Sequence, residues 1–260
     1  MFEQWQTDFL QYLRFEKRYS QHTLIAYRKD LDQFLTFIAG EFDIKEPKDL
    51  AHFHIRSWLA SLKDDAQMAR TINRKLSSLN SFYKYLLRHG VVEKNPVKQL
   101  HALRLPERLP SYMKENETEH FLEELQFEEG FKGFTERLIC ELLYQTGMRR
   151  NELLQLKEQD IEWSLRQVRI LGKGNKERLV PLSPMLLETL KEYIAEKKKL
   201  EKYDDTHLLI LETGEPLYAG YIYRVVNKYL ISVTMMPKRS PHVLRHTGAT
   251  HLLSNGANIQ

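Results

Sequence analysis

Arg166–Ser183 read RQVRILGKGNKERLVPLS, and this stretch decides the fold class. Val168 and Ile170 alternate with polar residues before a Gly-Lys-Gly-Asn turn, and Leu179 and Val180 follow the turn. Apolar residues placed in this way on both sides of a short glycine-containing turn are typical of a β-hairpin. A further apolar run, Thr206–Leu211, predicts a third short strand. The sequence therefore predicts a small antiparallel sheet.

The first hundred residues predict helices throughout. Ser20 suits a helix N-cap, and the residues after it carry apolar side chains at intervals of three and four, as on the buried face of a helix. The members of this stripe are Leu24, Tyr27, Leu31, Phe34, Leu35 and Ile38. Similar spacing predicts helices around residues 5–13, 55–62 and 67–88, the last of which ends at His89-Gly90. We expect a four-helix bundle.

The second half also predicts helices, apart from the hairpin. Their predicted ranges are 117–125 with Asn116 as cap, 134–145, 184–199, 219–230 and 241–253. Pro96, Pro106 and Pro110 indicate an extended linker between the two halves. The predicted fold is mainly α with a small antiparallel β-sheet. We expect a helical domain over residues 1–105, a linker over 106–112 and an α+β domain over 113–260.

The composition is that of an ordinary globular protein, with 42% hydrophobic and 28% charged residues in 260. No apolar run is long enough to span a membrane, and the first residues lack the order of a secretory signal. The single cysteine, Cys140, lies among apolar residues and cannot form an internal disulfide. We expect a cytoplasmic protein with no membrane segment.

The net charge of +4 is unevenly distributed. Residues 1–105 contain 17 Lys and Arg against 12 Asp and Glu, whereas the remainder is nearly balanced. Residues 67–90 contain no acid, and their basic residues include Arg70, Arg74, Lys75 and Lys84. Such a run is either a solvated helix face or a nucleic-acid surface.

Three separate stretches carry candidate catalytic residues. In TGMRRNELLQL (146–156) a helix stops at Thr146-Gly147 and another begins, which places Arg149 at a helix start and Glu152 in its first turn. Lys173 lies at the hairpin tip, where the following strand excludes a phosphate-binding P-loop. Taken singly, Arg149 and Lys173 are also compatible with an exposed surface role.

The third stretch is SPHVLRHTGATHLL (240–253). Ser240 suits an N-cap and Pro241 the first helical position, so His242 and Arg245 share one face at a helix N-terminus. Free amide groups, an imidazole and a guanidinium together form a strong anion site. With no metal-ligand spacing in the chain, the combined set suits phosphoryl transfer without a metal or other cofactor.

The order of these motifs resembles the tyrosine recombinases of the phage-integrase family, most of all the Xer-type and transposon-integrase members. YSQHTLIAYRKDLDQFLTFI (19–38) resembles part of that family's core-binding domain, so the likeness covers nearly the whole chain. The resemblance implies that Arg149 and Arg245 bind the scissile phosphate and that Glu152 assists them. It implies that Lys173 protonates the 5′ leaving oxygen and that His242 assists proton transfer.

The resemblance also implies the partners and the reaction. Such recombinases clamp duplex DNA between two domains, cleave it through a 3′-phosphotyrosine and act as tetramers on DNA. In such a clamp we expect the helical bundle to contact the DNA backbone through Arg70, Arg74, Lys75 and Lys84. Gly248 departs from the family pattern, since a bulkier residue is common there. No tyrosine lies beyond Tyr229, so the nucleophile is absent. We therefore expect a truncated chain that does not cleave DNA alone and is mainly monomeric until DNA gathers it.

Two alternative functions remain open from the sequence. The first is a non-catalytic DNA-binding or architectural protein that keeps the recombinase fold. The second is a metal-independent phosphodiesterase with His242 as its nucleophile. The sequence does not distinguish chromosome-dimer resolution from mobile-element integration, and it does not give a DNA target.

Overall fold

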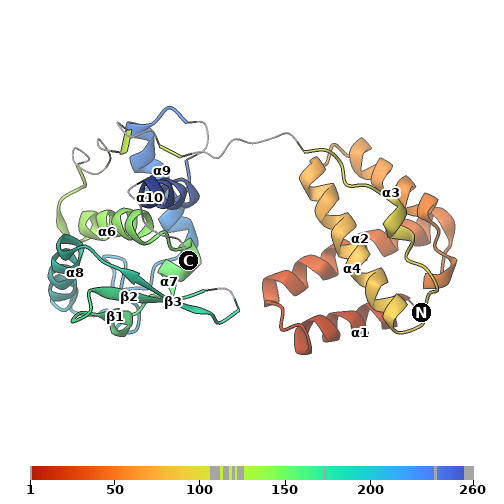
Figure 1. Ribbon diagram of the computed structural model, residues 1–260, viewed down its shortest axis with the longest axis horizontal. Helices are drawn as coiled ribbons and strands as arrows, with labels where there is room; N and C mark the ends of the chain where they lie inside the picture. Colours follow the sequence, from red (N-terminus) through yellow and green to blue (C-terminus); the bar gives the residue numbers. More distant parts are fainter. Residues whose placement is uncertain are drawn as a thin grey trace. The chain divides into compact units, whose positions relative to one another are not determined.

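The chain is mostly helical and contains a three-stranded antiparallel sheet (Figure 1). The computed structural model describes residues 2–105, 112–113, 117–118, 121, 126–172, 174–236 and 239–254, with side chains up to His251. Contacts within the chain divide it into two compact units, Met1–Arg108 and Leu109–Gln260. The linker predicted over 106–112 lies outside the described residues, apart from Tyr112.

Four α-helices form the N-terminal unit, which confirms the predicted bundle. They are α1 (Phe2–Phe15), α2 (Gln21–Phe42), α3 (His52–Asp64) and α4 (Ala69–Arg88), and two short 3₁₀ helices, η1 (Pro47–Asp49) and η2 (Pro96–Gln99), complete the unit. The Ser20 hydroxyl caps α2 by accepting a hydrogen bond from the Thr23 amide. Packed aromatic rings fill the core, with Phe9 against Phe82 and an edge contact between Phe34 and Trp58.

The C-terminal unit is built around α6 (Gly130–Thr146). Further helices whose bounds lie within the described residues are α7 (Arg150–Leu154), η4 (Glu158–Asp160), α8 (Pro184–Lys197), α9 (Ala219–Val233) and α10 (Pro241–Ser254). In Figure 1, α6 lies between α10 on one side and α8 on the other, and it packs against both. It begins four residues before the predicted start, whereas most of the helix predicted over 117–125 lies outside the described residues.

The predicted hairpin is confirmed. Strands β2 (Gln167–Leu171) and β3 (Glu177–Pro181) pair antiparallel, with Val168 opposite Val180 and Ile170 opposite Arg178. The third strand is β1 (Ile161–Glu162), which pairs with the other edge of β2. Because strand residues alternate between faces, Arg178 and Val180 point to the same side of β3.

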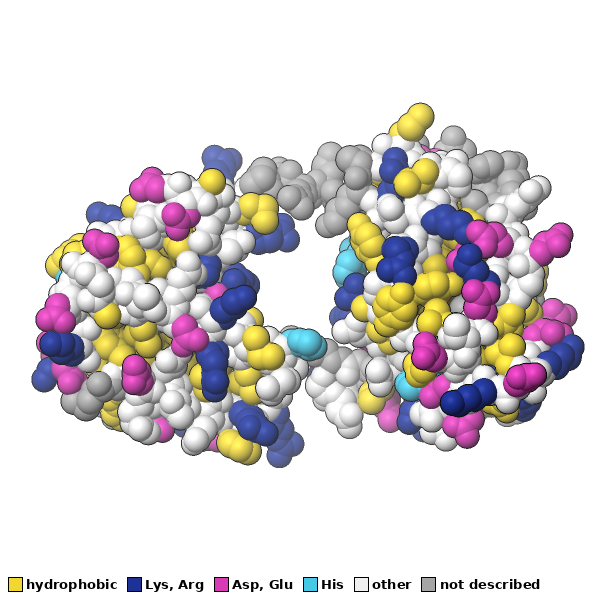
Figure 2. Space-filling view, turned by 180° about the vertical axis from the view of Figure 1, so that it is seen from behind, with side chains coloured by type: hydrophobic (Ala, Val, Ile, Leu, Met, Phe, Trp, Pro, Cys, Tyr) yellow, Lys and Arg dark blue, Asp and Glu magenta, His cyan; other side chains and the backbone are white. Residues whose placement is uncertain are grey.

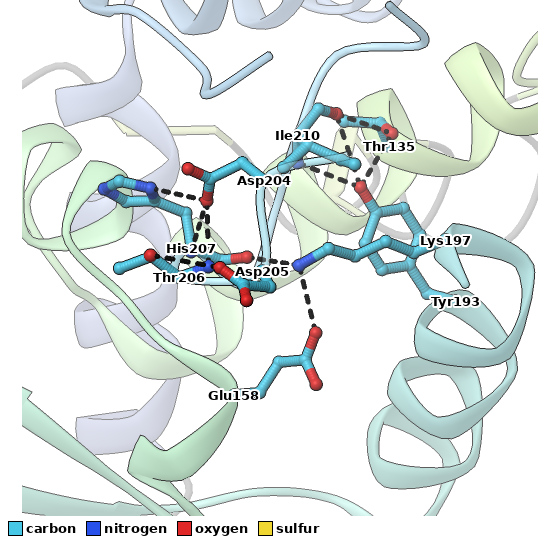
Figure 3. Close-up of polar contacts among 9 residues, drawn as sticks. All are labelled: Thr135, Glu158, Tyr193, Lys197, Asp204, Asp205, Thr206, His207 and Ile210. Carbon is cyan, nitrogen blue, oxygen red and sulfur yellow. Dashed lines mark hydrogen bonds and ion pairs between the residues drawn. The ribbon is translucent and has the colours of Figure 1, made fainter. Parts of the chain in front are cut away.

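The strand predicted over 206–211 is wrong, because side chains and loops satisfy the backbone of this segment. The Ile210 amide donates to the Tyr193 hydroxyl at 3.1 Å, and the Thr135 hydroxyl donates to the Ile210 carbonyl (Figure 3). The Leu208 amide donates to the Leu156 carbonyl, and Ile210 forms only an isolated bridge with Pro216. An apolar run can therefore be buried without joining a sheet, provided that its polar backbone groups are paired.

A fully buried lysine holds the same region to the rest of the unit. Lys197 has no exposed surface, and its ammonium lies 3.0 Å from Glu158 and 2.5 Å from the His207 carbonyl (Figure 3). Glu158 lies on η4, 39 residues before Lys197, and His207 lies on the loop after α8, 10 residues after Lys197. The buried ammonium thus joins three parts of the C-terminal unit.

Replacing Lys197 by methionine is expected to lower the free energy of unfolding by about 2 kcal/mol, because Glu158 and the His207 carbonyl lose a charged donor. Urea denaturation followed by circular dichroism measures this difference. The matched control is Lys191→Met on the same helix, whose half-exposed ammonium pairs with the exposed Glu188. We expect it to change stability by less than about 0.5 kcal/mol. Equal effects of the two substitutions would contradict this role of Lys197.

Within the described residues, no helix combines the length and apolar character needed to cross a membrane. Cys140 is buried in the core of the C-terminal unit, and its burial raises the pKa of the thiol.

Candidate active site

The junction between α6 and α7 presents Arg149. The helix α6 ends at Thr146, and Gly147 takes the left-handed conformation with φ of +58°, which glycine adopts at little cost. The Thr146 hydroxyl accepts a hydrogen bond from the Met148 amide, and the Met148 side chain is fully buried. The turn is therefore anchored on both sides of Gly147, and Arg149 follows as the N-cap residue of α7.

Glu152 is the centre of the site. Its side chain is 94% buried, and both carboxylate oxygens are hydrogen-bonded. Oε2 accepts from the Arg149 amide at 2.8 Å, and Oε1 accepts from Nη1 of the Arg149 side chain at 2.8 Å. The second bond fixes the direction of the Arg149 guanidinium, which remains half-exposed.

Arg178 is a member of the cluster that sequence reasoning missed. Its Nη2 donates to Glu152 Oε2 at 2.6 Å, although Arg178 lies on β3 and Glu152 on α7. The signal was present in the quoted hairpin, since Arg178 occupies the same face as Val180. A charged residue on the inward face of a strand requires a buried partner, and that partner here is Glu152.

Arg245 approaches the same cluster from α10. It is half-buried, while His242, one turn earlier on this helix, is exposed. Burial lowers the pKa of Arg245, repulsion from Arg149 and Arg178 lowers it further, and attraction to Glu152 raises it. Arg149, Glu152 and Arg178 therefore lie near enough to Arg245 to influence its pKa. Lys173 lies outside the described residues.

The predicted N-cap bond of Ser240 is not formed. Its hydroxyl is buried and has no hydrogen-bond partner among the described residues, although the Ser240 carbonyl accepts from the Val243 amide. Nη1 of Arg245 is likewise buried and unpaired within the described part of the chain. An unpaired buried guanidinium nitrogen is costly unless an anion supplies the acceptor, so the cluster is electrostatically suited to a bound anion.

Close packing against α6 determines the position of α10. A β-carbon added at Gly248 would lie 1.9 Å from the Tyr144 carbonyl oxygen, a distance that no side chain can occupy. The Thr247 side chain is fully buried and accepts a hydrogen bond from the Met113 amide. Gly248 thus allows the backbones of α6 and α10 to approach, and this approach determines where Arg245 lies.

The cluster makes stability depend on the charge of Glu152. Burial would by itself raise the pKa of Glu152, but hydrogen bonds from Arg178 and from the amide and side chain of Arg149 lower it to about 2. A carboxylate whose pKa is lower in the folded protein stabilises it at pH values above the unfolded pKa. This stabilisation is lost as the pH falls through the folded pKa.

Between pH 5 and pH 2, the native protein is therefore expected to lose about 2–3 kcal/mol that a Glu152→Gln variant does not lose. Urea denaturation at a series of pH values measures the difference between the two proteins. Glu188→Gln, which alters an exposed carboxylate on α8, is the control and should follow the native curve. Parallel curves for native protein and Glu152→Gln would refute the lowered pKa.

The predicted basic residues of the N-terminal unit do not all lie on the surface. Arg70, Arg74 and Lys84 are exposed on α4 at helical spacing, and Figure 2 shows Lys and Arg side chains gathered along one edge of this unit. Arg74 also forms an ion pair with the buried Asp30. Lys75 instead is 93% buried, where it bonds Gln33 and lies 3.6 Å from Asp30.

The position of Lys75 corrects its assignment to a DNA surface. The carboxylate of Asp30 is 98% buried and faces α4, so it draws a cation into the bundle. The Ser78 hydroxyl completes the shell of Asp30 at 2.8 Å. Lys75 therefore acts as an internal partner of Asp30, and we leave it out of the candidate DNA contacts below. Within the described ranges, no three His, Cys, Asp or Glu side chains form a group that could hold a metal ion.

Comparison with known proteins identifies the family. The phage integrase family matches residues 111–260, and the phage integrase N-terminal SAM-like domain matches residues 7–90. Tyrosine recombinase XerC of Listeria innocua is 35% identical over 255 residues, which cover 97% of this chain and 85% of the relative. Tyrosine recombinase XerD of Staphylococcus saprophyticus is 33% identical over 255 residues, covering 97% and 86%.

Solved structures share the fold. XerH site-specific recombinase bound to its palindromic difH substrate matches with a TM-score of 0.74 and 24% identity, over 91% of this chain and 70% of that chain. The Tn1549 transposon integrase in complex with transposon right end DNA matches with a TM-score of 0.74 and 18% identity, over 98% and 88%. The chain therefore belongs to the phage integrase family and is a homologue of the tyrosine recombinases XerC and XerD.

Proposed function

We propose that this chain binds duplex DNA and activates one scissile phosphodiester for strand cleavage and rejoining in site-specific recombination. The family is a class of enzymes, and relatives are named tyrosine recombinases. The observation that carries the proposal is the cluster around Glu152, where the guanidinium groups of Arg149 and Arg178 bond one carboxylate. The nearby Arg245 feels the charges of all three groups, and its Nη1 is buried without a partner among the described residues.

Charge explains why this cluster suits a phosphodiester. Three arginines and one carboxylate leave an excess of two positive charges, and arginine presents a planar fork that matches phosphate oxygens. Arg149 and Arg245 would bind the non-bridging oxygens, while Glu152 would hold Arg149 in place. His242, exposed on the first turn of α10, would assist proton transfer. Lys173 would protonate the 5′ leaving oxygen.

The proposal includes DNA binding by both units, as a two-domain clamp. In the N-terminal unit, the exposed residues Arg70, Arg74 and Lys84 would contact the phosphate backbone. Solved relatives include a lambda integrase dimer bound to a core site and a lambda integrase tetramer bound to a Holliday junction. We propose that this chain, too, assembles on DNA and that the DNA brings the copies together.

We also propose that none of the tyrosines in residues 1–260 is the nucleophile. The hydroxyls of Tyr221 and Tyr229 donate to the buried Glu136, and burial is the main reason that the pKa of Tyr229 rises to about 12. Tyr193 is fully buried, and burial raises its pKa to about 12 as well. Burial also raises the pKa of Tyr144. A phenol with a raised pKa is a poor source of phenolate.

Salt dependence tests the DNA-binding part. Binding of a fluorescent duplex from a randomised pool should weaken by about 0.9 log units per log unit of salt for each neutralised phosphate. Lys84→Gln should reduce this slope by about 0.9. Lys45→Gln, which alters an exposed lysine outside α4, is the matched control and should leave it unchanged. Absent or salt-independent binding would refute the proposal.

An added nucleophile tests the catalytic part independently of any tyrosine. Hydroperoxide anion from added hydrogen peroxide would attack phosphorus, the bond from phosphorus to O5′ would break, and O5′ would take a proton from Lys173. The substrate is the duplex that binds most tightly when selected from the randomised pool. We expect strand cleavage at one position that depends on both peroxide and protein.

Each other outcome selects a different function. Binding without peroxide-dependent cleavage would favour the alternative function, an architectural DNA-binding protein. The hydrogen-bonded and buried tyrosines favour this alternative. A covalent adduct formed through a tyrosine without peroxide would show that a tyrosine of this chain attacks. A phosphohistidine at His242 would indicate the phosphodiesterase.

A further inference from the structure

Arg178 is the cation that joins the hairpin to the Glu152 cluster. Its Nη2 donates to Glu152 Oε2 at 2.6 Å, the same oxygen that accepts from the Arg149 amide at 2.8 Å. One carboxylate oxygen therefore binds a side chain from β3 and the backbone at the start of α7. Within the described residues, this is the hydrogen bond that joins Glu152 to the hairpin.

The guanidinium of Arg178 also lies against the base of the hairpin turn. A β-carbon added at Gly172 would lie 3.5 Å from Arg178 Nη1 and 3.6 Å from Glu152 Oε1. The Gly172 amide donates to the Lys176 carbonyl at 2.7 Å, which closes the turn. The Arg178–Glu152 pair thus lies beside Gly172, and the next residue in the sequence is Lys173.

Burial and charge explain why this contact should be firm. Glu152 is 92% buried, and its two bonded arginines compensate a charge that would otherwise be costly to bury. The Arg178 side chain is about two-thirds buried, so little of the bond competes with water. A charge-assisted bond of 2.6 Å in such surroundings is stronger than one on the surface.

We infer that Arg178 is a positioning residue that holds the base of the hairpin turn, at Gly172 and Lys176, in register with Arg149. This inference rests on the proposed function for the role of Lys173, but the contact itself does not. One nitrogen of Arg178 is bound to Glu152 and the other faces Gly172. We therefore infer that the guanidinium acts between two parts of the protein and not on the phosphate.

Oxygen and sulfur leaving groups distinguish a positioning residue from one that contacts the phosphate. When the bond to O5′ breaks, the oxygen takes the electron pair and needs the proton that Lys173 supplies. A substrate with sulfur in place of O5′ releases a thiolate, whose conjugate acid has a pKa near that of cysteine, about 8.5, so it leaves without a proton. A residue that acts only through the hairpin turn, to which the proposed function assigns the proton donor, matters for the oxygen substrate and not for the sulfur substrate.

Amide hydrogen exchange tests the contact itself. We expect Arg178→Gln to accelerate exchange at the Gly172 and Arg149 amides by roughly tenfold. Arg178→Lys retains one charged donor and should restore part of the protection at Arg149. Arg169→Gln is the matched control, since it removes an exposed arginine from the neighbouring strand β2. It should leave both amides unchanged.

Peroxide-dependent cleavage then tests the role. We expect Arg178→Gln to slow cleavage of the oxygen substrate by about 10²-fold, the scale of general acid catalysis, and to cleave the sulfur substrate near the native rate. Equal losses on both substrates would show that Arg178 acts on the phosphate, and would overturn the inference. Unchanged amide exchange in Arg178→Gln would overturn it as well.

The two proposals fail in different ways. If the native protein cleaves neither substrate, the catalytic part of the proposed function is wrong. Amide exchange then still decides whether Arg178 ties the turn to Glu152, because that measurement needs neither DNA nor cleavage.

Discussion

Arg245→Gln is expected to reduce peroxide-dependent cleavage by about 10²–10³-fold, the usual effect of removing one donor that stabilises charge in a transition state. Its Nη1 is buried and has no partner among the described residues, so a phosphate oxygen would be the acceptor that this nitrogen lacks. Glutamine removes the charge and the fork but keeps a polar side chain. The rate of cleavage of the selected duplex, measured at saturating protein, checks the prediction.

Two further variants make the result specific. Arg245→Lys keeps the charge without the planar fork and should recover only part of the rate. Arg137→Gln removes an arginine from α6 that pairs with Glu141 at a distance of 2.7 Å, and it should leave the rate unchanged. A loss in Arg245→Gln matched by an equal loss in Arg137→Gln would point to net charge alone. An unchanged rate in Arg245→Gln would remove this residue from the site.

Gly248→Ala is expected to lower the free energy of unfolding by more than about 3 kcal/mol, at the upper end of the usual cost of overpacking. The added β-carbon would lie 1.9 Å from the Tyr144 carbonyl oxygen and 2.9 Å from its carbonyl carbon. Backbone atoms of α6 cannot turn away as a flexible side chain can, so α10 must shift. Urea denaturation measures the loss of stability.

The shift of α10 should also reach the site, because Arg245 lies on this helix. Gly220→Ala is the matched control in the same unit, since the nearest atom to its added β-carbon is a Tyr218 ring carbon at 3.4 Å. It should change stability by less than about 1 kcal/mol. A Gly248→Ala variant as stable as native protein would contradict the close approach of α6 and α10. It would also fit the bulkier residue that the family resemblance led us to expect at this position.

Local patterns were sufficient for most of the helices and for the hairpin. The α2 stripe that includes Leu31, Phe34 and Ile38 is buried, and Ser20 caps its helix as predicted. The turn after Ile170 also lies where the glycines indicated. These features depend on residues within a few positions of one another, and periodicity and turn chemistry record such short-range preferences directly.

The local sequence did not predict which groups pair with the polar atoms of a given segment. The apolar run over 206–211 has strand composition, yet Tyr193 and Thr135 pair its backbone. The Ser240 hydroxyl at the start of α10 has the composition of a cap but does not form the cap bond. Alternative partners from distant segments decide such cases, and a local pattern does not contain them.

The sequence by itself determined the family motifs, the fold class and the residue types available for phosphate chemistry. Only the tertiary structure decided which charged side chains are exposed and which are paired inside the protein. It places Lys75 inside the bundle beside Asp30, although the sequence put Lys75 in an exposed basic run. It also brings Arg178 on β3 into a hydrogen bond with Glu152 on α7. The physical reason is that the cost of burying a charge depends on its partner, and these partners lie 45 and 26 positions away in the chain.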